Sequence, residues 1–247
     1  MKKPKTLITI SVILCALAAA FAQKADKPWT EWSKTDVQKM LEDSPWAKVQ
    51  NDTDTSQQFF TPTSDSRING ARTTSSDLSR ATEGATNQAV TVKYVVRLFS
   101  ARPVREALAR KITLQQKLPD EKFAGLRQFA EVKSDNSIIV TVSIESSTDQ
   151  RSSNKAMQAF ASGATGTLKN NTYLQRNDGK QLFLEEYVPP GKDGFGARFI
   201  FLRYPDKKPF VDAQTTELRF FAQLSDNLKI DRRFKVADMM YHGELEY

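Results

Sequence analysis

The sequence predicts an α+β protein, with a strand–helix–helix–strand–helix unit followed by an antiparallel, β-rich C-terminal half. Three observations support this class. Residues 90–98 alternate apolar and polar side chains with the period of a strand. Residues 103–160 carry apolar residues at helical spacing on either side of a β-branched run at 138–144. Residues 218–236 alternate again in two adjoining runs, as an antiparallel hairpin with one buried face does.

Residues 1–22 have the pattern of an export signal. Three lysines lie within the first five positions, residues 7–19 are almost all apolar, and Ala20-Phe21-Ala22 has the small-x-small pattern of a cleavage site. We expect cleavage between Ala22 and Gln23, which leaves a mature chain of about 225 residues in the periplasm or outside the cell. The apolar run is short for a membrane span and no second one follows, so we expect no transmembrane segment in the mature chain. Export also disfavours a nucleic-acid partner.

Composition removes several chemistries from the mature chain. The single cysteine, Cys15, lies inside the export signal, so neither a disulfide nor a thiolate nucleophile is expected after cleavage. The formal charge is +7, and loss of the three signal lysines lowers it to +4. This mildly basic balance suits anionic envelope components, but it is also ordinary for a soluble protein.

Residues 23–50 predict a helical segment rich in tryptophan. Ser33 has the position of an N-cap, with Asp36 three residues later as a variant of the capping box. Trp32 and Val37 have the spacing of a hydrophobic staple. Ser44-Pro45 then predicts a second, short helical turn.

All three tryptophans, Trp29, Trp32 and Trp46, lie in this segment. One interpretation is that they clamp the segment onto the main domain. The other is that they form an aromatic surface that binds a protein or an envelope polymer, because exposed tryptophans are enriched at binding sites.

Residues 51–88 are dominated by polar residues and show no apolar period. Such a composition cannot bury enough apolar surface to offset the entropy lost on ordering, so we predict a disordered linker. The folded α+β domain is expected to cover residues 89–247.

The first half of this domain contains the predicted helices. After the strand at 90–98, one helix covers residues 103–112 and a second begins at Pro119. The strand at 138–144 follows, and a crossover of this length permits parallel pairing with the first strand. A third helix starts at Ser152-Ser153 and ends at Gly163.

The second half predicts strands. Residues 173–175 and 181–187 flank Asp178-Gly179, a step that favours a tight hairpin turn. Further strands are expected at residues 197–204, 218–224 and 228–236.

Catalytic and cofactor motifs are weak. His242 is the sole histidine, and neither a metal-ligand spacing nor a nucleophile elbow accompanies it, so we predict a surface residue. The glycine-rich loop at residues 191–196 lacks the ending of a phosphate-binding loop and precedes a strand, which predicts a turn. Glu185 and Glu186 point to opposite faces of one strand and cannot act as a pair. We therefore expect neither a cofactor nor a metal.

One basic-aromatic cluster is a candidate anion-binding site. Arg203, Lys207 and Lys208 lie close together, with Tyr204 and Phe210 among them. A solvated loop is the alternative interpretation.

Several motifs resemble a family of uncharacterised exported proteins of environmental Gram-negative bacteria. They are Trp29-x-x-Trp32-Ser33, Ser44-Pro45-Trp46-Ala47 and Phe234-Lys235-Val236-x-Asp238 to Leu245-Glu246-Tyr247, together with residues 97–110. The resemblance implies export and a shared architecture. The family has no assigned activity, so the resemblance implies no site residues.

Together these observations favour a non-catalytic binding or scaffolding protein of the periplasm or extracellular space over an enzyme. The alternative is a secreted hydrolase that uses carboxylates from separate elements, because the catalytic carboxylates of glycosidases come from different elements of the fold.

Overall fold

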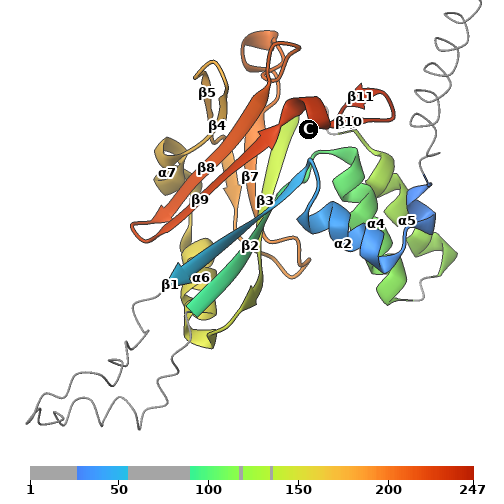
Figure 1. Cartoon of the computed structure of the whole chain (residues 1–247), viewed down its shortest axis with the longest axis horizontal. Coiled ribbons are helices and arrows are strands. Elements are labelled where there is room, and N and C mark those ends of the chain that lie inside the picture. The colour runs from blue at the N-terminus through green and yellow to red at the C-terminus, as the bar shows by residue number, and fades with distance from the viewer. Residues whose placement is uncertain (1–26, 55–89, 117–118, 134–135) are drawn as a thin grey trace, which may run out of the picture.

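The computed structural model describes residues 27–54, 90–116, 119–133 and 136–247 (Figure 1). The predicted export signal and residues 55–88 of the predicted linker lie outside this range, so both stay predictions.

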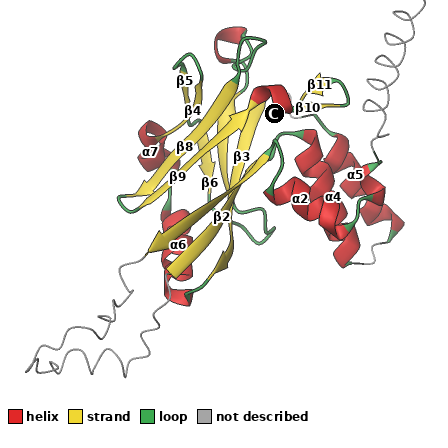
Figure 2. Ribbon diagram, viewed as in Figure 1, coloured by secondary structure: helices red, strands yellow, loops and turns green. Residues whose placement is uncertain are grey.

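The fold is α+β with a β-rich C-terminal half, as the sequence predicts (Figure 2). One sheet has the order β1-β2-β3-β7-β6: β1 (Ala47–Asp54), β2 (Val90–Leu98), β3 (Ser137–Ser147), β7 (Ala197–Leu202) and β6 (Glu186–Val188). The other has the order β5-β4-β8-β9: β5 (Gln181–Phe183), β4 (Thr172–Arg176), β8 (Glu217–Ser225) and β9 (Leu228–Lys235). A small hairpin, β10 (Met240–Tyr241) and β11 (Glu244–Leu245), follows.

The helices lie around the sheets. α2 (Lys34–Glu42), α4 (Arg102–Gln115) and α5 (Asp120–Glu131) pack together at one side, whereas α6 (Gln150–Ser162) lies at one end (Figure 1). Short helices complete the described chain: η1 (Trp29–Glu31), α7 (Thr165–Leu168), η2 (Lys169–Asn171), η3 (Pro205–Lys207) and η4 (Val236–Asp238).

The two sheets share one core. Phe199 and Phe201 of β7 meet Phe220 of β8, with ring centroids 5.2 and 6.3 Å apart. All three rings are fully buried. Alternate residues of β8 and β9 face this core, which confirms the predicted hairpin with one buried face.

The side chain of Gln50 joins the edges of the two sheets. Its Nε2 donates to the main-chain oxygen of Lys229 (2.6 Å), and its Oε1 accepts from the main-chain N–H of Asp231 (3.0 Å). Edge strands otherwise expose unpaired main-chain groups, so one amide on β1 satisfies part of the β9 edge.

The strands at 90–98 and 138–144 pair antiparallel, so the possibility of parallel pairing raised by the sequence is not realised. α4 and α5 pack against each other as a helical hairpin between these strands. The two helices bring the chain back to the end of the sheet at which β2 finishes. β3 therefore starts beside the end of β2, with Val140 opposite Leu98.

The predicted cap of α2 is confirmed. The Ser33 hydroxyl accepts from the N–H of Asp36, and the Asp36 carboxylate accepts from the N–H of Ser33. α6 begins at Gln150, because Asp149 rather than a serine caps it, and it ends at Gly163 as predicted.

The predicted second helical turn at Trp46 is wrong. Ser44 bridges to Ala47, and residues 47–54 form strand β1 along β2. The main-chain oxygen of Trp46 accepts from Leu98, so pairing with β2 overrides the local helix signal. The strand also crosses the expected boundary at residues 50/51, so the tryptophan segment is part of the main sheet.

The backbone conformation requires glycine at two positions. Gly179 has φ of 85° in the turn between β4 and β5, as the Asp178-Gly179 prediction requires. Gly196 also has φ of 85°, and a Cβ there would lie 2.3 Å from the main-chain oxygen of Val142. The glycine-rich loop thus lets β7 approach β3 closely.

Candidate functional site: a cavity beneath helix α6

The three tryptophans do not form an exposed surface. Trp29, Trp32 and Trp46 are 7%, 8% and 4% exposed and belong to the core. The Trp46 indole donates to the main-chain oxygen of Glu246 at 2.7 Å. These positions are those that the clamp interpretation requires, and an aromatic binding face is not available at these residues.

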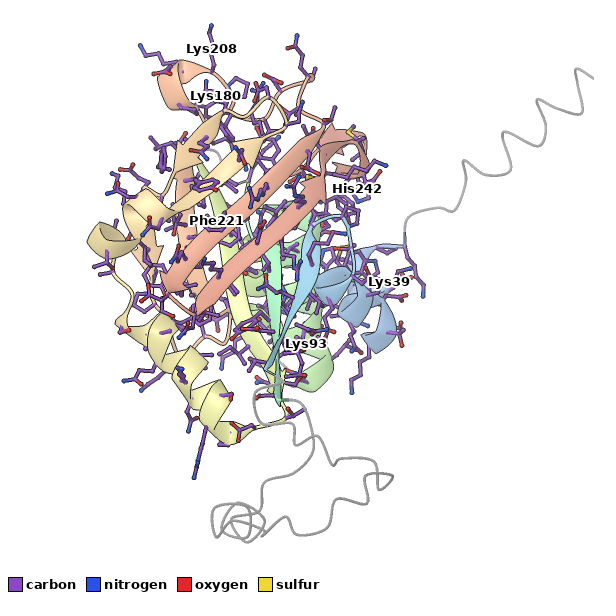
Figure 3. The ribbon with its side chains drawn as sticks, turned by 60° about the vertical axis from the view of Figure 1, so that its left-hand side comes forward. Lys39, Lys93, Lys180, Lys208, Phe221 and His242 are labelled. Atoms are coloured by element: carbon purple, nitrogen blue, oxygen red, sulfur yellow. The ribbon has the colours of Figure 1, made fainter. Side chains whose placement is uncertain are left out.

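The candidate anion site is also not assembled. Arg203 is buried, its guanidinium lies 4.2 Å from the Tyr247 ring centroid, and it donates to the main-chain oxygen of Tyr247. Lys207 and Lys208 are exposed in the loop after β7, at the tip that Figure 3 shows. The sequence placed these cations together, but the fold turns the arginine inward.

Other predicted features are structural. His242 is exposed in the turn between β10 and β11, where its ring meets Tyr241 (Figure 3). In the loop at residues 191–196, Asp193 accepts from the N–H of Phe195 and pairs with Arg198. Among the described residues, no group of three or more metal-ligating side chains comes together.

The four-stranded sheet carries a row of aromatic rings, Phe183, Tyr173 and Phe221, on its outer face. Figure 3 labels Phe221. The rings of Tyr173 and Phe221 are 5.1 Å apart and only 24° from parallel, so they stack on each other across neighbouring strands. Cross-strand stacking stabilises a sheet. We therefore infer that these rings stabilise the fold. A flat binding platform requires ring faces turned toward the solvent, whereas the rings of Tyr173 and Phe221 face each other.

A cavity of about 540 Å³ lies beneath α6, where this helix crosses the end of β1 and β2 and meets the turn between β8 and β9. We call it the α6 cavity. Small-molecule sites usually have volumes of 300–1,000 Å³, an apolar lining and a few placed polar groups.

The floor of the α6 cavity is apolar. It consists of Val92 and Tyr94 from β2, Ala156 from α6 and Leu228 from β9, all buried. The Tyr94 ring packs against Phe160, with centroids 6.2 Å apart.

The Tyr94 hydroxyl is the polar group of this floor. Tyr94 is 2% exposed, and within the described residues its hydroxyl has no hydrogen-bond partner. Burial, with a smaller contribution from the charge of Asp52, raises the pKa of Tyr94 to about 12. The phenol is therefore neutral at ordinary pH and offers both a donor and an acceptor to whatever occupies the cavity.

The rim is polar, and its described residues carry no net charge. Its charged members are Asp52 and Lys155, one of each sign. Gln158 and Asn227 add exposed amides that have no hydrogen-bond partner among the described residues, and several serines lie between them. An amide carries a donor and an acceptor side by side.

Among the described residues that line this cavity Asp52 is the only carboxylate, so they do not supply the acid pair that the hydrolase alternative requires. The two most buried carboxylates of the described chain, Glu106 and Glu246, serve the fold instead. Glu106 accepts from Arg102 and from the Tyr241 hydroxyl, and Glu246 accepts from the N–H of Arg102 at 3.0 Å.

Sequence reasoning placed Tyr94 in a strand but did not recognise a site. The available signal was a tyrosine at an inward position of an otherwise aliphatic strand, since a buried phenol needs a partner. The rim residues come from β1, from α6 and from the turn between β8 and β9, and no local pattern connects those segments.

None of the helices in the described part of the chain is both long and apolar enough to cross a membrane. The chain matches no protein-family model, no curated protein and no solved structure.

Proposed function

We propose that the chain is an exported, non-catalytic binding protein and that the α6 cavity holds a neutral sugar unit. The observation that carries this proposal is the Tyr94 side chain, which is 2% exposed and lies in an apolar floor beneath a rim of hydrogen-bonding side chains. Its hydroxyl has no hydrogen-bond partner among the described residues and is not one of the fully buried polar atoms. The pattern of residues 1–22 supports export.

A sugar has the chemistry that this lining would recognise. The C–H face of a pyranose can pack on the floor, while its hydroxyls both donate and accept hydrogen bonds. Tyr94, Gln158 and Asn227 each offer both functions. A site built to bind hydroxyl groups rejects analogues that lack them, because its polar groups would then stay unpaired.

The charge of the rim favours a neutral sugar over charged small ligands. Asp52 and Lys155 leave the rim without net charge, so neither an anion nor a cation is favoured overall. The described lining has one carboxylate, whereas the mechanism of most glycosidases needs two, and this supports binding without cleavage.

Calorimetric titration of the chain from Gln23 to Tyr247 with cellobiose, maltose and diacetylchitobiose tests the proposal. We expect at least one disaccharide to bind. Tyr94→Phe should weaken its binding about tenfold, because one hydrogen bond of about 1.4 kcal/mol is lost. Tyr204→Phe is the matched control, since this tyrosine is 49% exposed and outside the cavity.

A second pair of variants tests the rim. Asn227→Ala is expected to weaken binding, whereas Asn170→Ala, at an exposed asparagine of η2, is not. Co-sedimentation with insoluble peptidoglycan, chitin and cellulose then distinguishes a polymer end from a free sugar. The proposal fails if no disaccharide of the panel binds, or if Tyr94→Phe and Tyr204→Phe bind it equally well.

A further inference from the structure

Arg105 is a buried cation that the protein leaves incompletely paired. It lies in α4 and is 5% exposed. Its Nη1 donates to the main-chain oxygen of Ser100. Among the described residues, its Nε has no hydrogen-bond partner and no carboxylate forms an ion pair with it. A buried charge without a partner is costly and calls for an explanation.

Two other arginines of this fold, Arg97 and Arg102, show how a carboxylate compensates such a charge. Arg97 is also 5% exposed, but it pairs with Glu145 at 2.7 Å and donates to the main-chain oxygen of Leu41. Arg102 pairs with Glu106 at 2.8 Å. Both oxygens of the Glu106 carboxylate are thereby used, by Arg102 and Tyr241, and neither is bonded to Arg105.

Electrostatics agree with this geometry. Burial lowers the pKa of Arg105, and the more distant charges of Glu246 and Glu106 offset the effect only in part. A carboxylate in direct contact would offset it further.

Arg105 lines a second cavity, of about 470 Å³, between α4, α5 and the start of β3. We call it the Arg105 cavity. Its walls are mainly apolar side chains: Phe99, Phe129, Val132 and Ile139. Phe99 and Phe129 lie 5.9 Å apart, and Val132 is 55% exposed at the surface.

The cavity has an opening at Gly125 of α5. A Cβ at this residue would meet nothing within 4 Å, although Gly125 belongs to the lining. No residue lining the Arg105 cavity also lines the α6 cavity.

We propose that the Arg105 cavity binds an apolar monocarboxylic acid, whose carboxylate pairs with the Arg105 guanidinium and whose hydrocarbon body lies along Phe99, Phe129 and Ile139. An arginine fork matches a carboxylate in geometry, and the pair is strengthened where water is excluded. A neutral apolar molecule would fill the walls but leave the charge unpaired. A phosphate would pair with the charge but gain nothing from the walls.

Decanoate, decanol and acetate are the probes that separate these contributions. Calorimetric titration should show decanoate binding at least about tenfold more tightly than decanol, which lacks the charge, and than acetate, which lacks the chain. Arg105→Gln should remove the difference between decanoate and decanol. Arg127→Gln, at an exposed arginine of α5, is the control for loss of positive charge.

A second variant does not depend on the buried arginine. Gly125→Leu should fill the opening and weaken both decanoate and decanol, and Gly166→Leu is its control, because a Cβ at Gly166 also meets nothing within 4 Å. If Arg105→Gln does not fold, the proposal is tested by the ratio of decanoate to decanol affinity in the wild-type chain and by the affinities of Gly125→Leu.

Equal binding of decanoate and decanol, or full decanoate affinity in Arg105→Gln or in Gly125→Leu, would overturn the proposal. Decanoate should not compete with a disaccharide and should bind Tyr94→Phe normally, so this proposal and the proposed sugar site can fail separately.

Discussion

Replacing Trp46 with phenylalanine tests whether the N-terminal segment is part of the core. The Trp46 indole is 4% exposed and donates to the main-chain oxygen of Glu246, 200 positions away in the sequence, at 2.7 Å. The ring edge also meets Tyr241, with centroids 5.9 Å apart and planes at 83°. A single side chain thus connects the start of β1 with the C-terminal residues.

The expected loss of stability is the sum of two effects. Phenylalanine cannot donate a hydrogen bond, and leaving a buried carbonyl unpaired costs about 1–3 kcal/mol. Its smaller ring leaves unfilled volume, which adds about 1 kcal/mol. We therefore expect Trp46→Phe to lower the free energy of unfolding by about 2–4 kcal/mol, and Trp46→Ala by about 3–5 kcal/mol.

Urea denaturation of the chain from Gln23 to Tyr247, with the m-value compared between variants, is the assay. Trp32→Phe is the matched control, since its indole donates at 2.9 Å to Lys27, only five residues away and partly buried. This control should lose only about 1 kcal/mol. A loss below about 0.5 kcal/mol for Trp46→Phe, or equal losses for both variants, would refute the reasoning.

Three further predictions follow from single contacts. Gly196→Ala should cost well over 1 kcal/mol, because its Cβ would collide with Val142, whereas Gly194→Ala, with φ of 74° and open space, should cost about 1–2 kcal/mol in urea denaturation. Gln50→Met should lower the free energy of unfolding by about 1–3 kcal/mol through loss of both bonds to β9, and equal stability of this variant and the wild type would argue against the bridge. The pKa of Tyr94 is raised from 10.0 to about 12 in the folded chain. The stabilisation of the folded state by the neutral Tyr94 phenol is therefore complete below pH 10 and is lost as the pH rises through 12. The urea midpoint should therefore fall less between pH 9 and pH 12 in Tyr94→Phe than in the wild type.

Local patterns in the sequence were sufficient for most of the individual elements. The alternation of apolar and polar residues in residues 90–98 and 218–236 identified strands, because successive side chains of a strand point to opposite faces of a sheet. The Ser33 cap and the Asp178-Gly179 turn were predictable for the same reason, since both are formed by hydrogen bonds or torsions within a few residues.

The strand at Trp46 and the two cavities were decided by the tertiary structure. β1 forms because β2 offers main-chain partners from a distant part of the chain, with Ala47 opposite Arg97 and Asp54 opposite Val90. That pairing overrides the local signal of Ser44-Pro45. The N-terminus of α4 is likewise capped from a distance: the N–H of Arg102 donates to the Glu246 carboxylate, whereas Ala101, the residue before the helix, has no side-chain acceptor. Contacts between residues so far apart leave no periodicity in the sequence.

The candidate sites show the same division. The sequence determined the residue types and their elements, including a tyrosine in β2 and an arginine in α4, together with a predicted export signal. Only the folded chain decided that Tyr94 lies beneath α6, that Arg105 lies against Phe99 and Phe129, and that the tryptophans are buried. A binding site depends on which side chains lack a partner after folding, and that is fixed by packing between distant segments.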